Sequence, residues 1–359
     1  MRLRPVLLSL LALSLATACA TTDTSTTKAA AVDTTKDQGP AAELRLGYFA
    51  NVTHAGPVYG VGKGLYQEAL GSTTLKTQVF NAGPAAVEAL FAGAVDAAYL
   101  GPNPAVNGFV KSGGEALRIV SGATSGGASL VVAKGITSPA QLKGKIVASP
   151  QTGGTQDVAL RTWLAGNGFR VDQSGAGDVT IRAQENAQTL QEFQAGRIAG
   201  AWVPEPWASR LVLEGGGSVL VDEKALWPGG KFVTTHLVVR TQYLEEHPQT
   251  VKALIEGQVK ADQAIAADQA GAKTVINAQL EELTGKALKP ATIDRAFSGI
   301  TITEDPLAET LKTSAQHGFA TGLTKEADLT GIYDLRLLRE VLGTDVSDAG
   351  LGAATEQKG

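Results

Sequence analysis

Short runs of apolar residues alternate along most of the chain with segments in which apolar residues recur at helical spacing. In the first part, strands are predicted at Leu44–Tyr48, Thr74–Phe80 and Ala97–Leu100, each followed by a predicted helix. Further along, strands are predicted at Lys145–Ala148, Val179–Ala183 and Ala199–Val203. This alternation predicts an α/β fold with a mostly parallel sheet, whose ligands bind at the carboxyl ends of the strands.

The order of the predicted elements repeats within the chain. Residues 88–93 read Glu-Ala-Leu-Phe-Ala-Gly before a predicted strand, and residues 191–196 read Gln-Glu-Phe-Gln-Ala-Gly before another. Few residues are identical, but a helix, a glycine stop and a strand follow one another in both places. The repeat predicts two similar lobes that face one ligand.

The stretch Asp96–Asn107 indicates how each lobe would form a site. It predicts a short buried strand, a turn at Gly101-Pro102 and a helix that begins near Asn103, with Asn103 as the N-cap and Pro104 in the first turn. A helix N-terminus presents unpaired N–H groups and a positive dipole end, which favour an anion. The stretch Pro204–Trp207 repeats this design in the second half.

These patterns predict the boundaries of the lobes. The first lobe is expected to comprise residues 43–128 and 235–345, and the second residues 129–234. The predicted strand Thr234–Arg240 would return the chain to the first lobe and form a two-strand hinge with the segment Gly126–Ala133. Residues from Tyr243 to Leu342 are predicted to be helical with breaks, and residues 346–359 are predicted to be a disordered tail.

The N-terminal residues predict export. Arg2 and Arg4 precede the apolar run Val6–Ala16, which is too short to span a bilayer, so residues 1–18 are predicted to be a signal peptide. The segment before Cys19, the only cysteine, is similar to a lipoprotein cleavage box, which predicts a lipidated Cys19. An ordinary signal peptide with an incidental cysteine is the alternative. With a lipidated Cys19, residues 19–42 are expected to be the lipidated cysteine and a flexible, polar tether. The tether would hold the protein at the outer face of the cell membrane, on the periplasmic side where an outer membrane exists.

Composition and motifs argue against several functions. The net charge of −4 is mild and no basic stretch occurs, so a nucleic-acid partner is not expected. The sequence contains no Gly-x-Ser-x-Gly elbow, no cluster of His and Cys at metal-binding spacing and no dinucleotide fingerprint. The chain is therefore predicted to be a binding protein without a cofactor, and not an enzyme.

Five short segments in series resemble one family of binding proteins. The segments are 47–55, 101–105, 122–127, 154–157 and 205–207. They are similar to the substrate-binding proteins of ABC importers of the nitrate, sulfonate and taurine type, and most of all to aliphatic-sulfonate-binding members. This resemblance, which covers residues 44–342, implies a type II periplasmic-binding-protein fold that closes on a solute. It also implies that the solute passes to an ABC permease in the membrane, and such carriers are expected to be monomers.

The candidate ligand contacts lie in predicted loops after strands or at the predicted hinge. They are Asn51, His54, Gly101, Pro102, Asn103, Thr124, Ser125, Thr152, Gly154, Thr155, Gln156, Glu205, Trp207 and Thr235. Hydroxyl groups, ring N–H groups and backbone N–H groups at such positions suit an oxyanion. Several have a structural alternative, because Asn103 could serve only as an N-cap, His54 could be structural, and residues 152–155 could form a plain capping turn.

Glu205 and Trp207 leave the nature of the ligand open. A carboxylate beside a simple oxyanion would repel it, so Glu205 either pairs with Arg210, faces away from the ligand or receives an amine of a zwitterionic solute. Trp207 is either part of the core or a wall for an alkyl chain. The resemblance implies a small anionic solute, with an aliphatic sulfonate preferred, followed by taurine, nitrate, a phosphonate and a pyrimidine precursor. A protein of thiamine-pyrimidine synthesis and a solute sensor without a permease are alternatives, and the export signal argues against the first.

Overall fold

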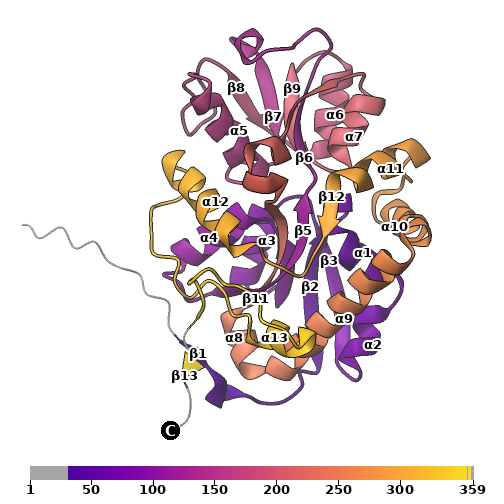
Figure 1. Cartoon of the computed structure of the whole chain (residues 1–359), viewed down its shortest axis with the longest axis vertical. Helices are drawn as coiled ribbons and strands as arrows, with labels where there is room; N and C mark the ends of the chain where they lie inside the picture. Colours follow the sequence, from indigo (N-terminus) through magenta and orange to yellow (C-terminus); the bar gives the residue numbers. More distant parts are fainter. Residues whose placement is uncertain (1–30, 354, 357–359) are drawn as a thin grey trace, which may run out of the picture.

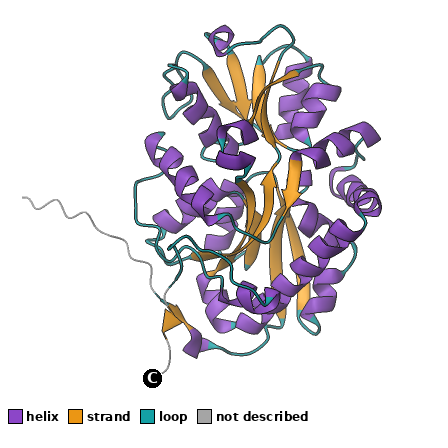
Figure 2. Cartoon of the chain, viewed as in Figure 1, coloured by secondary structure: helices purple, strands orange, loops and turns teal. Residues whose placement is uncertain are grey.

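Two β-sheets organise residues 31–353, 355 and 356, which the computed structural model describes (Figures 1 and 2). The first sheet has the strand order β12 (Ile300–Ile302), β5 (Leu117–Gly126), β11 (Val233–Arg240), β4 (Ala97–Leu100), β2 (Glu43–Phe49) and β3 (Thr74–Phe80). The second has the order β10 (Ser218–Asp222), β6 (Ala128–Val132), β9 (Gly200–Pro204), β7 (Ile146–Ser149) and β8 (Thr180–Ala183). The predicted α/β fold with two lobes, one around each sheet, is confirmed.

The two sheets are built in the same order. In the first lobe β2 pairs in parallel with β3 and β4, and in the second β7 pairs in parallel with β8 and β9. Each sheet then adds an antiparallel strand, β11 beside β4 and β6 beside β9. The predicted repeat is therefore confirmed in strand order, although the sequence identity between the two halves is low.

The chain passes from the first sheet to the second and back. β5 continues into β6 through Gly126 and Gly127, whose φ values of 77° and 76° favour glycine. The return from β10 to β11 runs through the 3₁₀ turns η4 (Glu223–Leu226) and η5 (Pro228–Gly230). One connection of the predicted hinge is thus a direct strand link, and the other is longer and contains two turns.

Helices flank both sheets (Figure 2). Those of the first lobe are α1 (Ala55–Gly62), α2 (Leu65–Leu70), α3 (Gly83–Phe91), α4 (Pro102–Lys111), α8 (Thr241–Glu246), α9 (Pro248–Ala267), α10 (Gln269–Thr284), α11 (Pro290–Gly299), α12 (Ala308–Ala320) and α13 (Arg336–Leu342). Those of the second lobe are α5 (Thr155–Gly166), α6 (Asn186–Gln194) and α7 (Trp207–Leu213). Shorter 3₁₀ turns are η1 (Thr34–Lys36), η2 (Val52–His54) and η3 (Pro139–Leu142). The predicted helical region after Tyr243 also contains β12, which is too short to show strand alternation.

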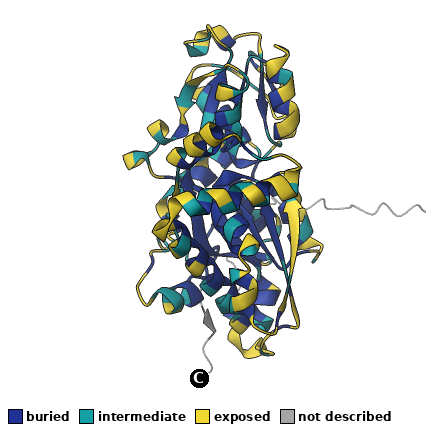
Figure 3. Cartoon of the chain, turned by 90° about the vertical axis from the view of Figure 1, so that its right-hand side faces the viewer, coloured by how far each residue is buried: buried dark blue, intermediate teal, exposed yellow. Residues whose placement is uncertain are grey.

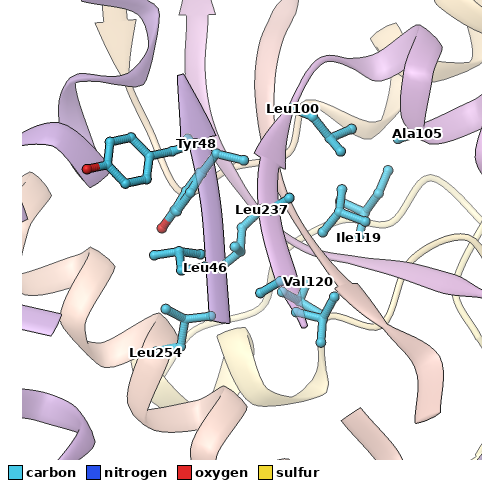
Figure 4. Packing of buried hydrophobic residues seen from close by; sticks show 14 of the residues in the cluster. Leu46, Tyr48, Leu100, Ala105, Ile119, Val120, Leu237 and Leu254 are labelled. Atoms are coloured by element: carbon cyan, nitrogen blue, oxygen red, sulfur yellow. The ribbon is translucent and has the colours of Figure 1, made fainter. Parts of the chain in front are cut away.

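Buried apolar side chains fill the space between the sheets and their helices. Figure 4 shows Leu46 and Leu237 of the first sheet packed near Leu254 of α9, and all three are fully buried. In the second lobe neighbouring residues of a strand face opposite sides, so Trp202 joins one core cluster and Val203 the other. In Figure 3 most strands lie in the buried interior, whereas the edge strand β3 is exposed along most of its length. Strands buried on both faces explain the continuous apolar runs in the sequence.

Two segments that the sequence predicts to be unstructured are packed against the first lobe. In the predicted tether, Val32 is fully buried, and the N–H of Ala41 donates to Oγ1 of Thr250 at 2.9 Å. In the predicted tail, Val346 is buried, and the carbonyl of Leu351 accepts from an N–H of the preceding loop at 3.0 Å. The strand β1 (Val32–Asp33) pairs in parallel with β13 (Thr355–Glu356), so the two segments support each other (Figure 1).

The predictions of an unstructured tether and tail are thus wrong for the described residues of these two segments. Each is too short to show a periodic pattern. The N-terminal segment packs on distant residues, as the separation of 209 between Ala41 and Thr250 shows, whereas the tail bonds to the loop around Tyr333, which has no periodic pattern of its own. The predicted signal peptide and Cys19 lie outside the described residues. Within residues 31–353, no helix is long and apolar enough to cross a membrane.

A buried carboxyl group lies in the connection that returns the chain to the first lobe. Glu223 of η4 is 2% exposed, and the indole Nε1 of Trp202 donates to its Oε2 at 2.7 Å. Burial raises the pKa of Glu223 from 4.5 to about 7. Because the folded pKa is raised, the contribution of the protonated carboxyl to stability is complete below about pH 4.5 and is lost as the pH rises through about 7.

We expect Glu223→Gln to be more stable than the wild type at pH 9, by up to roughly 3 kcal/mol, because the amide accepts the bond from Trp202 without a charge to bury. At pH 4 the difference should nearly vanish. Urea unfolding of both proteins at the two pH values measures the free energies of unfolding. Equal pH dependence in the two proteins would contradict this role of Glu223.

Candidate functional site

A small buried hollow, here called the inner hollow, lies where loops of the two lobes meet. The first lobe lines it with Phe49, Asn51, Thr53, His54, Asn81, Ala82, Gly83, Gly101, Pro104, Thr234 and Thr235, and the second with Pro150, Gly154, Thr155, Gln156, Asn186 and Pro204. Most of these residues follow the carboxyl ends of the parallel strands, where α/β folds bind ligands. The cavity volume of the inner hollow is about 30 Å³, which suits a head group of a few atoms.

Helices of both lobes begin at the inner hollow without a side-chain cap. α1, α3 and α4 start there from the first lobe, and α5 and α6 start there from the second. In the structure, the residue before each helix accepts no hydrogen bond from the helix N–H groups through its side chain. These residues are His54, Ala82, Gly101, Gly154 and Glu185. Because the first N–H groups of a helix need an acceptor and carry a positive dipole end, these starts favour a bound anion.

In the second lobe a buried carboxylate holds the loop that presents Thr155. Asp157 accepts from Ser149 Oγ at 2.9 Å and from the N–H of Gly153 at 3.0 Å. It also accepts from Nε of Arg161, at 3.0 Å. Thr155 is then placed at the hollow with its Oγ1 buried, and among the described residues this hydroxyl has no hydrogen-bond partner. A buried unpaired hydroxyl is costly and therefore points to a missing partner at this position.

In the first lobe the histidine at the hollow is neutral. His54 is 3% exposed, its ring lies 4.2 Å from that of Phe49, and its Nδ1 accepts from the N–H of Phe49 at 3.4 Å. Burial lowers the pKa of His54 to about 3. An imidazole that accepts through Nδ1 carries its proton on Nε2, so His54 can offer one N–H donor across the physiological pH range.

Contacts across the cleft hold the two lobes together around the hollow. Nε1 of Trp207 donates to Oδ1 of Asn51 at 2.9 Å, and Nδ2 of Asn81 donates to Oε1 of Glu185 at 2.6 Å. The N–H of Thr53 donates to a carbonyl of the second lobe at 3.3 Å. These bonds join the two lobes directly across the cleft.

Gly101 of the first lobe and Thr155 of the second meet at the hollow. A Cβ placed on Gly101 would overlap Oγ1 of Thr155 and lie 3.2 Å from its Cβ. Two predicted ligand contacts, one from each lobe, therefore lie next to each other across the cleft.

The inner hollow combines polar and apolar side chains but has no charged one among its described lining residues. Of the described residues that line it, none is Asp, Glu, Lys or Arg. Across the described part of the chain, no group of three or more His, Cys, Asp or Glu side chains could hold a metal ion. Any anion would thus be held by hydroxyl, amide, imidazole and backbone N–H groups.

The structure brings seven of the fourteen predicted contacts to the inner hollow. These are Asn51, His54, Gly101, Gly154, Thr155, Gln156 and Thr235. The other seven, Pro102, Asn103, Thr124, Ser125, Thr152, Glu205 and Trp207, do not line it. Thr152 is exposed, and Thr124 and Ser125 lie within β5 between β11 and β12.

Asn103 is structural. The N-cap of α4 is Gly101 and not Asn103, which is already the second helical residue. The Nδ2 of Asn103 donates to the carbonyl of Ser314 at 2.8 Å and so ties α4 to α12. The predicted N-cap was wrong because Pro102 fits the first helical position better than Pro104 does.

Glu205 and Trp207 act at the cleft but outside the inner hollow. Oε2 of Glu205 accepts from the N–H of Ser209 at 3.0 Å, and burial raises the pKa of Glu205. Arg210 pairs with Glu214 at 3.0 Å, so the predicted alternative of a pair with Glu205 is wrong. Glu205 thus faces away from the hollow, and Trp207 serves the cross-lobe bond to Asn51.

Sequence reasoning missed several lining residues that share one signal. Asn81 follows β3 and lies two residues before the start of α3, and Asn186 follows β8 and is the first residue of α6. Thr155 has the same signal, because it is a polar residue at a junction where a strand is followed by an uncapped helix. Applied to every strand–helix junction of the repeat, the same criterion would have found both asparagines.

We expect Gly101→Ala to hinder closure of the lobes without unfolding them, because its φ and ψ of −77° and 166° suit alanine but the new Cβ would collide with Thr155. Small-angle scattering in the presence of a solute that compacts the wild type measures closure. The control is Gly166→Ala, where a Cβ meets nothing within 4 Å. Equal compaction of both variants would contradict the closed contact.

Comparison with known proteins places the fold and the site in context. The NMT1-like family matches residues 37–279 of the chain. The taurine-binding periplasmic protein of Escherichia coli (strain K12) is 29% identical over 194 residues, which cover 53% of this chain and 57% of that protein.

Two solved structures share the fold. The alkanesulfonate-binding protein SsuA from Xanthomonas axonopodis pv. citri, bound to MOPS, has a TM-score of 0.65 at 22% identity and covers 80% of this chain and 95% of that one. The periplasmic nitrate-binding protein NrtA from Synechocystis PCC 6803 has a TM-score of 0.72 at 17% identity and covers 88% and 92%. All three of these relatives are binding proteins, and the prediction of a binding protein that is not an enzyme is confirmed. The chain belongs to the NMT1-like family, and its two α/β lobes have the periplasmic-binding-protein fold of these two solved structures.

Proposed function

We propose that this protein captures a small organic anion, an aliphatic sulfonate, in the inner hollow and delivers it to an ABC permease. One observation carries the proposal. Uncapped helix N-termini of both lobes converge on one buried, uncharged hollow that contains an unpaired hydroxyl at Thr155. A sulfonate head group has three acceptor oxygens and one negative charge, which such donors and dipole ends can satisfy together.

The magnitudes are compatible with useful affinity. A hydrogen bond to a charged group contributes on the order of 1.5–3 kcal/mol. Three or four such bonds would support roughly micromolar binding after the costs of ordering the lobes and the solute are subtracted. Because donors come from both lobes, the ligand binds the closed form better than the open form and shifts the equilibrium toward it.

The absence of an acid at the inner hollow favours a plain sulfonate over an aminosulfonate. Glu205 was the candidate partner for an amine, but its carboxyl accepts from Ser209 and does not line the hollow. An ammonium group would therefore lack a carboxylate among the described lining residues.

We also propose that Cys19 is lipidated and holds the protein, as a monomer, at the outer face of the cell membrane. The proposal rests on the cleavage box before this single cysteine and on the apolar run that precedes it. Cys19→Ser should move the protein from the membrane fraction to the soluble exported fraction. A variant that stays with the membrane would contradict lipidation.

We expect Thr155→Val to weaken binding of an alkanesulfonate by about tenfold or more, because the hydroxyl is the unpaired donor at the hollow. The melting temperature should hardly change. The matched control is Thr152→Val, three residues earlier in the same loop, exposed and outside the lining. A thermal-shift screen with sulfonates, taurine, nitrate and bicarbonate selects the ligand, and calorimetry measures the affinities. Equal affinity in both variants would remove Thr155 from the site, and a lack of binding by every compound would contradict the proposed function.

A further inference from the structure

A buried carboxyl group lies directly behind one of the helix starts at the inner hollow. α9 packs against α1, and Asp262 of α9 is 6% exposed. Gly56 is the second residue of α1, and a Cβ placed on it would lie 2.7 Å from Oδ1 of Asp262. Glycine at this position thus lets the carboxyl approach the backbone of the first turn of α1, two residues after His54, which lines the hollow.

The structure supplies few hydrogen-bond donors to Asp262. Its Oδ1 has no partner among the described residues, and its Oδ2 lies 3.4 Å from Nε2 of Gln258. The same nitrogen donates to the carbonyl of Gly122 at 2.7 Å and to Oγ of Ser121 at 3.2 Å, so its two hydrogens are shared among three acceptors. A protonated carboxyl, which needs fewer donors and carries no charge, fits this environment better than a carboxylate.

No cation compensates a charge on Asp262. Among the described residues, the titratable groups that interact with it electrostatically are Tyr66 of α2, Tyr99 of β4 and Glu304, two residues after β12. Burial raises the pKa of both tyrosines well above 10, so they stay neutral. Burial and the nearby carboxylate of Glu304 raise the pKa of Asp262 well above its usual range.

Asp262 reaches solvent on a side of the first lobe away from the inner hollow. It lines a pocket of about 350 Å³ between α9, α11 and β12, together with the half-buried Glu304. This pocket shares no lining residue with the inner hollow, and no Lys or Arg is among its described lining residues. A proton can therefore exchange between Asp262 and solvent without passing a solute in the hollow.

We propose that Asp262 binds a proton together with the anion, an inference that rests on the function proposed above. The start of α1 favours an anion in the inner hollow, and a carboxylate behind its first turn would oppose that anion. A bound anion therefore favours the protonated acid, and by linkage the protonated acid favours the anion. The affinity for the anion is highest where Asp262 is protonated and falls as the pH rises and the proton leaves.

Calorimetry with ethanesulfonate between pH 5 and pH 9.5 tests the proposal. We expect the affinity to fall by roughly tenfold toward the upper end, the effect of like charges about 10 Å apart at an effective dielectric constant of about 20. His54 does not titrate in this range, because burial lowers its pKa to about 3. Buffers with different ionisation enthalpies should report uptake of part of a proton with each anion.

The outcomes separate this proposal from the proposed function. Binding that is independent of pH and takes up no proton would overturn the proton site and leave the proposed function intact. A lack of binding at every pH would contradict the proposed function, and the coupling with it. The proton count is measured on the wild type, so this test does not depend on whether a variant folds.

Variants of the two acids in the pocket assign the proton. Asp262→Asn should bind ethanesulfonate at pH 9.5 about as tightly as the wild type does at pH 5. The matched control, Glu304→Gln, should keep the fall but move it to lower pH, because loss of the Glu304 charge lowers the pKa of Asp262. Burial also raises the pKa of Glu205 and of Glu223. A fall that persists unchanged in Asp262→Asn would assign the proton to another acid and overturn the proposal.

Discussion

The first N–H groups of a helix have no partner within the helix, and a protein must satisfy them by other means. In most helices a Ser, Thr, Asp or Asn side chain does so. Around the inner hollow the structure shows no such cap at Ala82, Gly101 or Gly154. Glycine and alanine at these positions leave the N–H groups and the dipole ends directed at the space that both lobes enclose.

In this arrangement, backbone N–H groups and helix dipoles provide the positive potential at the site, and charged side chains do not. The described lining of the hollow contains no charged side chain, and burial keeps His54 neutral. Backbone dipoles that are fixed by the fold need little reorganisation when an anion enters, and they carry only partial charge. Under the proposed function, a monovalent anion held by partial charges could leave such a site again, as delivery to a permease requires.

Closure depends on small residues at the cleft. Gly101 allows the first lobe to contact Thr155 of the second, and Gly126 and Gly127 form the direct connection between the sheets. Asn51 and Asn81 then add hydrogen bonds across the cleft. Besides the two connections and these polar contacts, α11 packs against α7 and α12 against α5 across the cleft, while separate apolar cores hold each lobe together.

Much of this architecture could be predicted from the sequence, because alternating strands and helices are strong local signals. The repeat at residues 88–100 and 191–203 predicted the matched sheets, and Gly101 and Thr155, both predicted as ligand contacts at strand–helix junctions, lie next to each other in the structure. The side-chain partners could not be predicted, because they depend on contacts distant in the sequence. Asn103 bonds to Ser314, 211 positions away, and Val32 is buried by residues that no local pattern connects to it.

A crystal structure of the protein with methanesulfonate tests the central claim most directly, and anomalous scattering from the ligand sulfur would mark the head group. The account predicts the sulfur in the inner hollow, with its oxygens within hydrogen-bonding distance of the N–H groups that begin α5 and of donors from the first lobe. A sulfonate bound elsewhere, or one held there by an arginine or lysine side chain, would contradict it.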